Sequence, residues 1–149
     1  MRAIVVDQPG GIETLMVRDV PEPEIGSKEI LIETAYCGCN WADLQRRQGT
    51  YPHRVDYPHI MGREVSGTVI GLGTGAEGFA VGDRVIAIPS SGGYAERCIA
   101  PTRLVSRLPD MIPFDIGAAI QVQATTAWHM LNTLYKIRHG ETVLVHAAA

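Results

Sequence analysis

The sequence lacks a long apolar run, a cluster of one charge and a cysteine framework. Without a stretch of about 18 apolar residues, and at a mean hydropathy of +0.05, it predicts no transmembrane helix. Its 13 basic and 16 acidic residues are interspersed, which leaves no basic surface for nucleic acid or an anionic membrane. The first residues, Met1–Val6, lead into a turn and contain no apolar core of a signal peptide. Three cysteines, without an even-numbered disulfide framework, are typical of a protein in a reducing compartment. We therefore expect a cytoplasmic protein with no nucleic-acid or membrane partner.

What is present in the first hundred residues is a series of short apolar segments separated by glycine and proline. Each is rich in residues that favour strands, and each needs a second layer to cover its apolar face. The segments predict an antiparallel barrel or sandwich. The expected strands are Arg2–Val6, Leu15–Val20, Glu29–Tyr36, Glu64–Leu72, Asp83–Ile88 and Tyr94–Ile99.

The pattern changes after Pro113. Apolar residues recur at helical spacing over Thr126–Ile137, which predicts a helix that ends at His139-Gly140. The run Glu141–His146 is continuously apolar and β-branched, as in a parallel strand covered by helices on both faces. The chain is therefore expected to pass from a β domain into an α/β domain.

Three motifs carry a resemblance to a known family: Gly62–Gly67, Gly82–Val85 and Gly93–Glu96. Together they resemble the catalytic domain of the medium-chain dehydrogenase/reductase superfamily. Zinc-dependent members have cysteine and histidine where this chain has Asn40 and Arg63, so the resemblance is to the zinc-free branch, the NADPH:quinone oxidoreductase group. A guanidinium about 4 Å from a divalent ion would repel it by roughly 8 kcal/mol at an effective dielectric near 20, so no metal site is expected. Arg63 is expected to pair with Asp43 or Glu64, or to meet an anionic part of the substrate.

The resemblance implies a mainly β GroES-like barrel followed by a helix and the first strand of a truncated Rossmann α/β domain. The implied parts are a GroES-like catalytic domain over residues 1–112, a linking helical segment over 113–140, and the first strand of an incomplete dinucleotide-binding domain over 141–149. The 149 residues are too few to hold a nucleotide. We expect an N-terminal fragment that is inactive alone. Its uncovered apolar surface is expected to lead to a homodimer, to disorder after about residue 110, or to aggregation.

Asn40 and Asp43 are the first two candidate catalytic residues, because Gly38–Asp43 matches the quinone oxidoreductase motif. The resemblance places Asn40 beside the nicotinamide and the substrate carbonyl, where its amide could donate to a developing oxyanion. Asn40 could instead bond only to a turn backbone. Asp43 would orient groups around the pocket, or else cap a helical segment over residues 44–48.

Tyr51 and Thr126 complete the predicted site. Tyr51 is the third candidate catalytic residue, as a proton source or an aromatic wall, with core packing as the alternative. Thr126 matches the threonine that the family places against the nicotinamide carboxamide, so Asn40 and Thr126 are the expected cofactor-binding residues. Thr126 should open the linking helix, and without the resemblance it would be interpreted as a helix cap.

The function implied by the resemblance is hydride transfer without zinc, from NADPH to a quinone or an α,β-unsaturated carbonyl. Gln45 departs from the family, which often has tyrosine there, and this weakens the prediction of a quinone-stacking surface. Two alternatives remain: a stand-alone GroES-like binding or structural module, and a fragment of a zinc-dependent alcohol dehydrogenase. Cys37 and Cys39 are expected to act as small apolar residues, not as a redox pair.

Overall fold

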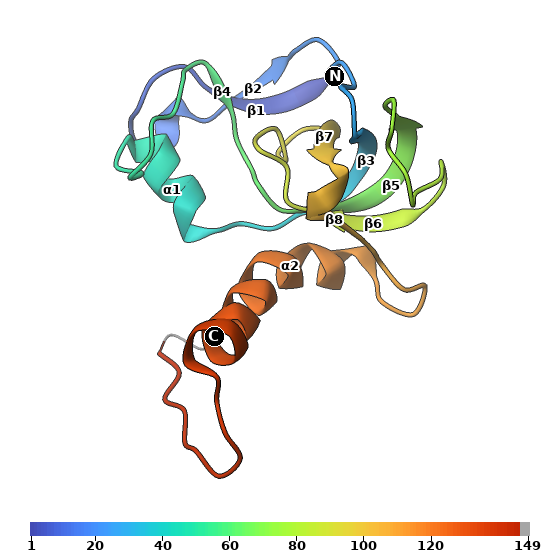
Figure 1. The fold of residues 1–149 in the computed structure, drawn as a ribbon. Coiled ribbons are helices and arrows are strands. Elements are labelled where there is room, and N and C mark those ends of the chain that lie inside the picture. The colour runs from blue at the N-terminus through green and yellow to red at the C-terminus, as the bar shows by residue number, and fades with distance from the viewer. Residues whose placement is uncertain (147–149) are drawn as a thin grey trace.

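The computed structural model describes residues 1–146, which form two antiparallel sheets and a long helical segment (Figure 1). The first sheet has the order β2-β1-β4 and the second the order β7-β3-β5-β6-β8. A single bridge between Ala3 and Ala95 links them, so the strands form two open sheets and not one closed barrel within residues 1–146. The strands are β1 Arg2–Val6, β2 Met16–Asp19, β3 Glu29–Cys37, β4 His59–Ile60, β5 Val65–Leu72, β6 Arg84–Ala87, β7 Arg97–Pro101 and β8 Val105–Arg107.

The six predicted strands are confirmed, with bounds shifted by up to three residues. β4 and β8 were not predicted because two or three residues are too few to show an alternating pattern. In β3, Ile30 and Ile32 are fully buried while Leu31 and Glu33 face away, as period-two alternation requires. These isoleucines pack with Val65, Val69 and other apolar residues in the main core, and each fully buried side chain contributes about 1.5–3 kcal/mol.

A short helix, α1 Trp41–Gln48, follows β3 and precedes the loop to β4. Asn40 is its N-cap residue, and the Asp43 carboxylate at the third helical position accepts the backbone N–H of Asn40 at 3.0 Å. The alternative that Asp43 itself caps the helix is therefore wrong. Gly49 ends the helix at φ 75°, a left-handed conformation that costs glycine little.

The long helical segment begins near the start of the linking segment expected over residues 113–140, and before the helix that apolar spacing predicted over Thr126–Ile137. α2 spans Phe114–Trp128 and continues as a π-helical segment, η3 His129–Tyr135. Thr126 therefore lies near the end of α2, and the prediction that it opens the helix is wrong. The helix starts at Pro113 because the sheet covers its first turns: Gly117 and Ala118 are buried, and a Cβ at Gly117 would lie 2.9 Å from Ile86 Cγ2.

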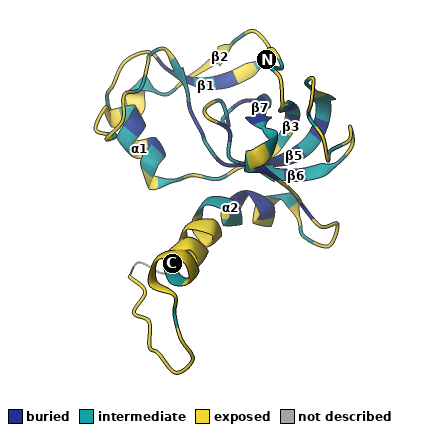
Figure 2. Ribbon diagram, in the orientation of Figure 1, coloured by how far each residue is buried: buried dark blue, intermediate teal, exposed yellow. Residues whose placement is uncertain are grey.

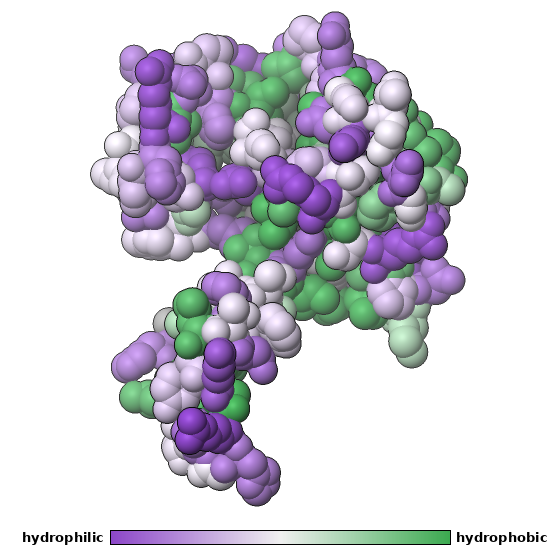
Figure 3. All heavy atoms as spheres, viewed as in Figure 1, coloured by the Kyte–Doolittle hydropathy of each residue, from purple (hydrophilic) through white to green (hydrophobic). Residues whose placement is uncertain are grey.

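Beyond its first turns the helical segment extends away from the sheets and is exposed (Figure 2). Its large apolar residues include Trp128, Leu134 and Tyr135, which are more than 60% exposed. Apolar side chains are visible on this projecting part of the molecule in the space-filling view (Figure 3). Two one-turn 3₁₀ helices complete the secondary structure, η1 Ile12–Thr14 and η2 Thr102–Leu104.

The strand expected over residues 141–146 does not form. A parallel strand needs a neighbouring strand for its backbone hydrogen bonds, and within the described range none lies beside it. Leu144 and Val145 are accordingly exposed. Residues 147–149 of the predicted third domain lie outside the described residues, and the expected domain boundaries stay predictions. No helix in the described chain has both the length and the apolar character needed to span a bilayer.

Candidate functional site

All four predicted site residues lie around one cavity. It has a volume of about 230 Å³ and is formed where α1, the Arg63 turn and the second half of α2 meet. Asn40, Asp43, Tyr51 and Thr126 line it although 86 positions separate the first from the last (126 − 40). Its other lining residues are Ala42, Arg46, Arg63, Ile88, Val122 and Thr125.

The side chain of Asn40 is fixed at both ends. Its Nδ2 donates to Glu64 Oε2 at 2.9 Å, and its Oδ1 accepts from Gln123 Nε2 at 2.6 Å. Because a carboxylate oxygen can only accept here, the Glu64 contact determines which end of the amide carries the NH2 group. An NH2 group has two hydrogens, so one remains available to a ligand among the contacts that the structure describes.

Glu64 is the residue that joins this asparagine to the helix. It is 0% exposed, and its other oxygen, Oε1, accepts the backbone N–H of Val122 at 2.8 Å. Gly38 makes room for it, because a Cβ there would lie 2.5 Å from Glu64 Oε2 and 2.3 Å from the carbonyl oxygen of Ala118. Buried charged groups are stable only when hydrogen-bonded, so Glu64 holds Asn40 and α2 in one arrangement.

Asp43 is buried and belongs to a second network. Its Oδ2 accepts from the Tyr94 hydroxyl at 3.0 Å as well as from the Asn40 backbone. Burial of the Tyr94 ring, and then its contacts with Cys39 and Asp43, raise the pKa of the phenol far above its ordinary value. Tyr94 therefore stays protonated and serves as a fixed donor to Asp43.

Arg46 lies between Asp43 and Tyr51. Its guanidinium carbon is 3.8 Å from the centre of the Tyr51 ring, a cation–π contact. Its Nη1 is 3.9 Å from Asp43 Oδ1, which is an ion pair but too long for a hydrogen bond. Both atoms are buried without a hydrogen-bond partner among the described residues.

Arg63 does not make the expected ion pair. Its Nε donates to the carbonyl oxygen of Pro89 at 3.2 Å, while Asp43 pairs with Arg46 and Glu64 is occupied by Asn40 and Val122. The predicted pairing of Arg63 with Asp43 or Glu64 is therefore wrong. It failed because both carboxylates are claimed by donors from α1 and α2, a tertiary arrangement that sequence spacing does not show.

A second cavity adjoins the first. It has a volume of about 350 Å³ and shares Arg46, Tyr51 and Arg63 with the first cavity. The His53–Asp56 loop, His59 and the hydroxyl-bearing residues Ser90 and Ser91 form the rest of its wall. Burial, and then the neighbouring Arg46, lower the pKa of His59.

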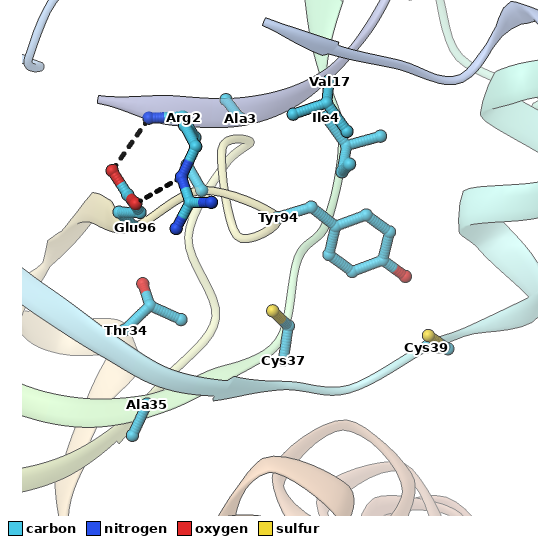
Figure 4. Close-up of a pocket in the computed structure, with 11 residues that line it drawn as sticks. Arg2, Ala3, Ile4, Val17, Thr34, Ala35, Cys37, Cys39, Tyr94 and Glu96 are labelled. Atoms are coloured by element: carbon cyan, nitrogen blue, oxygen red, sulfur yellow. Dashed lines mark hydrogen bonds and ion pairs between the residues drawn. The ribbon is translucent and has the colours of Figure 1, made fainter. Parts of the chain in front are cut away.

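A third cavity, of about 430 Å³, contains none of the predicted residues (Figure 4). It lies under β1, with Cys37, Cys39 and Tyr94 on its wall, and the ion pair between Arg2 and Glu96 closes one side. Arg2 and Glu96 pair with each other, and the Tyr94 and Thr34 hydroxyls bond Asp43 and Cys98. Site chemistry therefore points to the smaller cavity around Asn40, because that cavity combines a free amide hydrogen, three hydroxyls and charged atoms without hydrogen bonds among the described residues.

Sequence reasoning missed Glu64, Tyr94, Arg46 and Gln123 as parts of the site. One signal was present: Asn40 followed three positions later by Asp43 is the pattern of a capping box, which marks the start of α1. The contacts of Glu64 with Asn40 and Val122 span 24 and 58 positions, so no local sequence pattern predicts them. In the part of the chain that the structure describes, no three His, Cys, Asp or Glu side chains are grouped as metal ligands would be.

Comparison with known proteins identifies the family of this chain. Residues 26–110 match the alcohol dehydrogenase GroES-like domain, and the chain belongs to this family. Within it, the chain is similar to quinone oxidoreductases, as the sequence motifs predicted. It is 37% identical over 151 residues to the human quinone oxidoreductase, covering 100% of this chain and 46% of that protein. It is 35% identical over 142 residues to a probable quinone oxidoreductase of Schizosaccharomyces pombe, and the match covers 95% of this chain and 42% of that protein.

The structural comparison agrees. The mycobacterial protein Rv1454c, solved in complex with NADPH, superposes with a TM-score of 0.92 at 38% identity, over 99% of this chain and 45% of that chain. The expected fold, a mainly β GroES-like unit followed by a helix, is confirmed. The chain spans less than half the length of each of these relatives.

Proposed function

We propose that the protein carrying this chain is a zinc-independent reductase that transfers hydride from NADPH to a quinone or an α,β-unsaturated carbonyl. The observation that carries the proposal is the convergence of Asn40, Asp43, Tyr51 and Thr126 on one cavity. The similarity to quinone oxidoreductases, one neighbour of which was solved with NADPH, supports it.

The residues around the cavity suit a nicotinamide ring. Ile88 and Val122 offer apolar walls for its faces, and the Thr125 and Thr126 hydroxyls are placed to bond a carboxamide. Bound NADPH would supply the hydride. The chain itself would hold the ring through Thr126 and Asn40, with the rest of the cofactor bound elsewhere in the protein.

Asn40 is proposed to stabilise the oxygen that becomes negative as the acceptor is reduced. Its orientation is fixed in advance by Glu64 and Gln123, so no reorganisation is needed when charge develops. Tyr51, or a water beside it, would deliver the proton that completes the reduction. Asp43 would act by positioning, because its carboxylate holds the start of α1 and neighbours Arg46.

Two further expectations belong to the same proposal. The exposed apolar residues of η3 and of residues 143–145 support self-association, and we propose a homodimer and an inactive isolated chain. The three cysteines are free thiols, which supports the cytoplasm as its location.

The test is loss of activity in Asn40→Ala. The protein should be expressed from the complete reading frame that contains these residues, and NADPH oxidation followed with 1,4-naphthoquinone. We expect kcat to fall about 100-fold, the usual cost of removing one oxyanion donor.

The matched control is Asn132→Ala, which removes an amide from the exposed η3 segment, where among residues 1–146 its side chain bonds only the Trp128 carbonyl. It should leave kcat unchanged. Unaltered turnover in Asn40→Ala would contradict the proposed role of Asn40, and no NADPH oxidation by the wild-type protein with any quinone or enone would contradict the proposed function.

A further inference from the structure

More arginine than acidic side chains line the second cavity and the one that adjoins it. Arg46, Arg54 and Arg63 line it, and the acids of the two adjoining cavities are Asp43 and Asp56. Arg54 pairs with Asp56 at 2.7 Å at the exposed rim, and Arg46 faces Asp43. Arg63 remains without an acidic partner among residues 1–146, since its Nε bonds only a carbonyl oxygen.

Two buried polar atoms at this cavity lack hydrogen bonds. Arg46 is 5% exposed, yet its Nη1 has no hydrogen-bond partner in the described chain. His59 Nε2 is also buried and has no hydrogen-bond partner among the described residues. Buried polar atoms are nearly always satisfied, so these two atoms show that the described chain leaves the wall of this cavity incompletely hydrogen-bonded, although both lie beneath its surface.

We propose that Arg46 and Arg63 bind an anionic group on the hydride acceptor, and that the substrates of this protein are quinones or enones that carry a carboxylate or a phosphate. The inference rests on the proposed function, because it assigns the second cavity to the same substrate whose reducible carbonyl lies by Asn40. The two cavities share three wall residues, and we assign one acceptor molecule to both.

The chemistry of the wall favours an oxyanion. Guanidinium groups present paired N–H donors that match the geometry of carboxylates and phosphates. Arg46 is held in place by the Tyr51 ring and by the Asp43 ion pair, so little side-chain freedom is lost on binding. Burial is the main cause of the lowered pKa of His59 beside this wall, and the positive charge of Arg46 lowers it further.

The first experiment measures binding and needs no turnover. Isothermal calorimetry should compare 1,4-naphthoquinone-2-sulfonate, as the anionic probe, with neutral 1,4-naphthoquinone. We expect the sulfonate to bind at least about tenfold more tightly, as one charge-assisted hydrogen bond allows. Equal Kd values for the two probes would overturn the proposal.

Arg63→Gln is the informative variant, because Arg63 is only half-buried and its loss leaves the α1 contacts intact. It should abolish the preference for the sulfonate. Arg103→Gln is the matched control: it removes the same charge from an exposed position in η2 that lines neither cavity. An equal loss in both variants would show a general charge effect and overturn the site.

Competition distinguishes the two sources of the anion. Inorganic phosphate that displaces the sulfonate more strongly than acetate identifies a phosphate-bearing acceptor, and the reverse order identifies a carboxylate-bearing one. Displacement by neither overturns the proposal. If a phosphate of the cofactor occupied this cavity instead, Arg63→Gln would raise the KM for NADPH and leave the KM for the acceptor unchanged. That outcome would also overturn the proposal.

Steady-state rates separate this inference from the proposed function. Reduction of both probes with equal kcat/KM would leave the reductase proposal standing and remove the anion site. A wild-type protein that binds the sulfonate selectively but does not oxidise NADPH would retain the anion site and remove the reductase proposal.

Discussion

The two ends of the long helical segment differ sharply in what holds them. The start of α2 is tied to the sheets: Gly117 packs on Ile86, Ser66 bonds the carbonyl of Phe114, and Glu64 bonds the backbone of Val122. The end, over η3, has only exposed residues apart from a half-buried Leu131. The difference shows that the body of the protein determines the helix as far as the candidate site, and that the segment after it adds little to the stability of that body.

The contrast bears on function because the site lies at the boundary between the two ends. Asn40, Glu64 and Val122 connect β3, β5 and α2, while Thr126 stands on the first exposed turn. The substrate half of the cavity is therefore rigid, and the cofactor half depends on a turn that the body does not cover.

Glu64→Ala should break the tied end and give the largest effect. It removes the carboxylate acceptor of the half-buried Asn40 Nδ2 and Val122 N–H, and a buried group that loses its partner costs about 1–3 kcal/mol. We expect a loss of about 3 kcal/mol in the free energy of unfolding, measured by urea denaturation with far-ultraviolet circular dichroism. Glu141→Ala is the control at the exposed end, and a change there as large as in Glu64→Ala would remove the contrast.

The pH dependence of stability sharpens the account of the charged cavity. Because the pKa of His59 is lowered from 6.5 in the folded protein, the unfolded chain binds the proton more tightly. Stability is therefore complete above about pH 6.5 and is lost as the pH falls below this value toward the lower folded pKa. Urea denaturation at about pH 7.5 and 5.5 should show a smaller loss in His59→Gln than in the wild type, and the same loss in both proteins would contradict this origin.

Leu134→Ser tests the free end and should give the smallest effect. Leu134 is 69% exposed, and surface substitutions usually change stability by less than about 0.5 kcal/mol. The same denaturation assay should find no shift beyond that range. The assay uses a protein concentration at which the proposed homodimer is dissociated, so a loss of more than about 1 kcal/mol would mean that η3 packs against the rest of the chain.

The sequence predicted the sheets well and the helix poorly, for a physical reason. Strands such as β3 show alternation in a few residues, so Ile30 and Ile32 identify the core face directly. The start of α2 is small and apolar on all sides, and only contact with Ile86 and Leu108 shows why it begins at Phe114. The strand predicted over residues 141–146 had the right composition but no neighbouring strand in the described chain.

The candidate site likewise has a part that the sequence predicts and a part that it does not. Its four predicted residues follow from motif positions, and the structure brings all of them to one cavity. The residues that orient them could not be predicted, because Glu64 and Tyr94 reach Asn40 and Asp43 through tertiary contacts across 24 and 51 positions. Local pattern identifies the groups around the cavity, and packing determines which atoms remain free.

The central claim is that Glu64 joins Asn40 and α2 into one rigid unit. Hydrogen exchange on the 15N-labelled chain, followed by NMR, tests it most directly at the Val122 amide and the Asn40 side-chain NH2. We predict that both are protected in the wild type, that amides of residues 129–146 exchange rapidly, and that Glu64→Ala, which removes both acceptor oxygens, reduces protection at Val122 and Asn40 together. Rapid exchange of Val122 and Asn40 in the wild type, or loss of protection at only one of them in Glu64→Ala, would contradict the account.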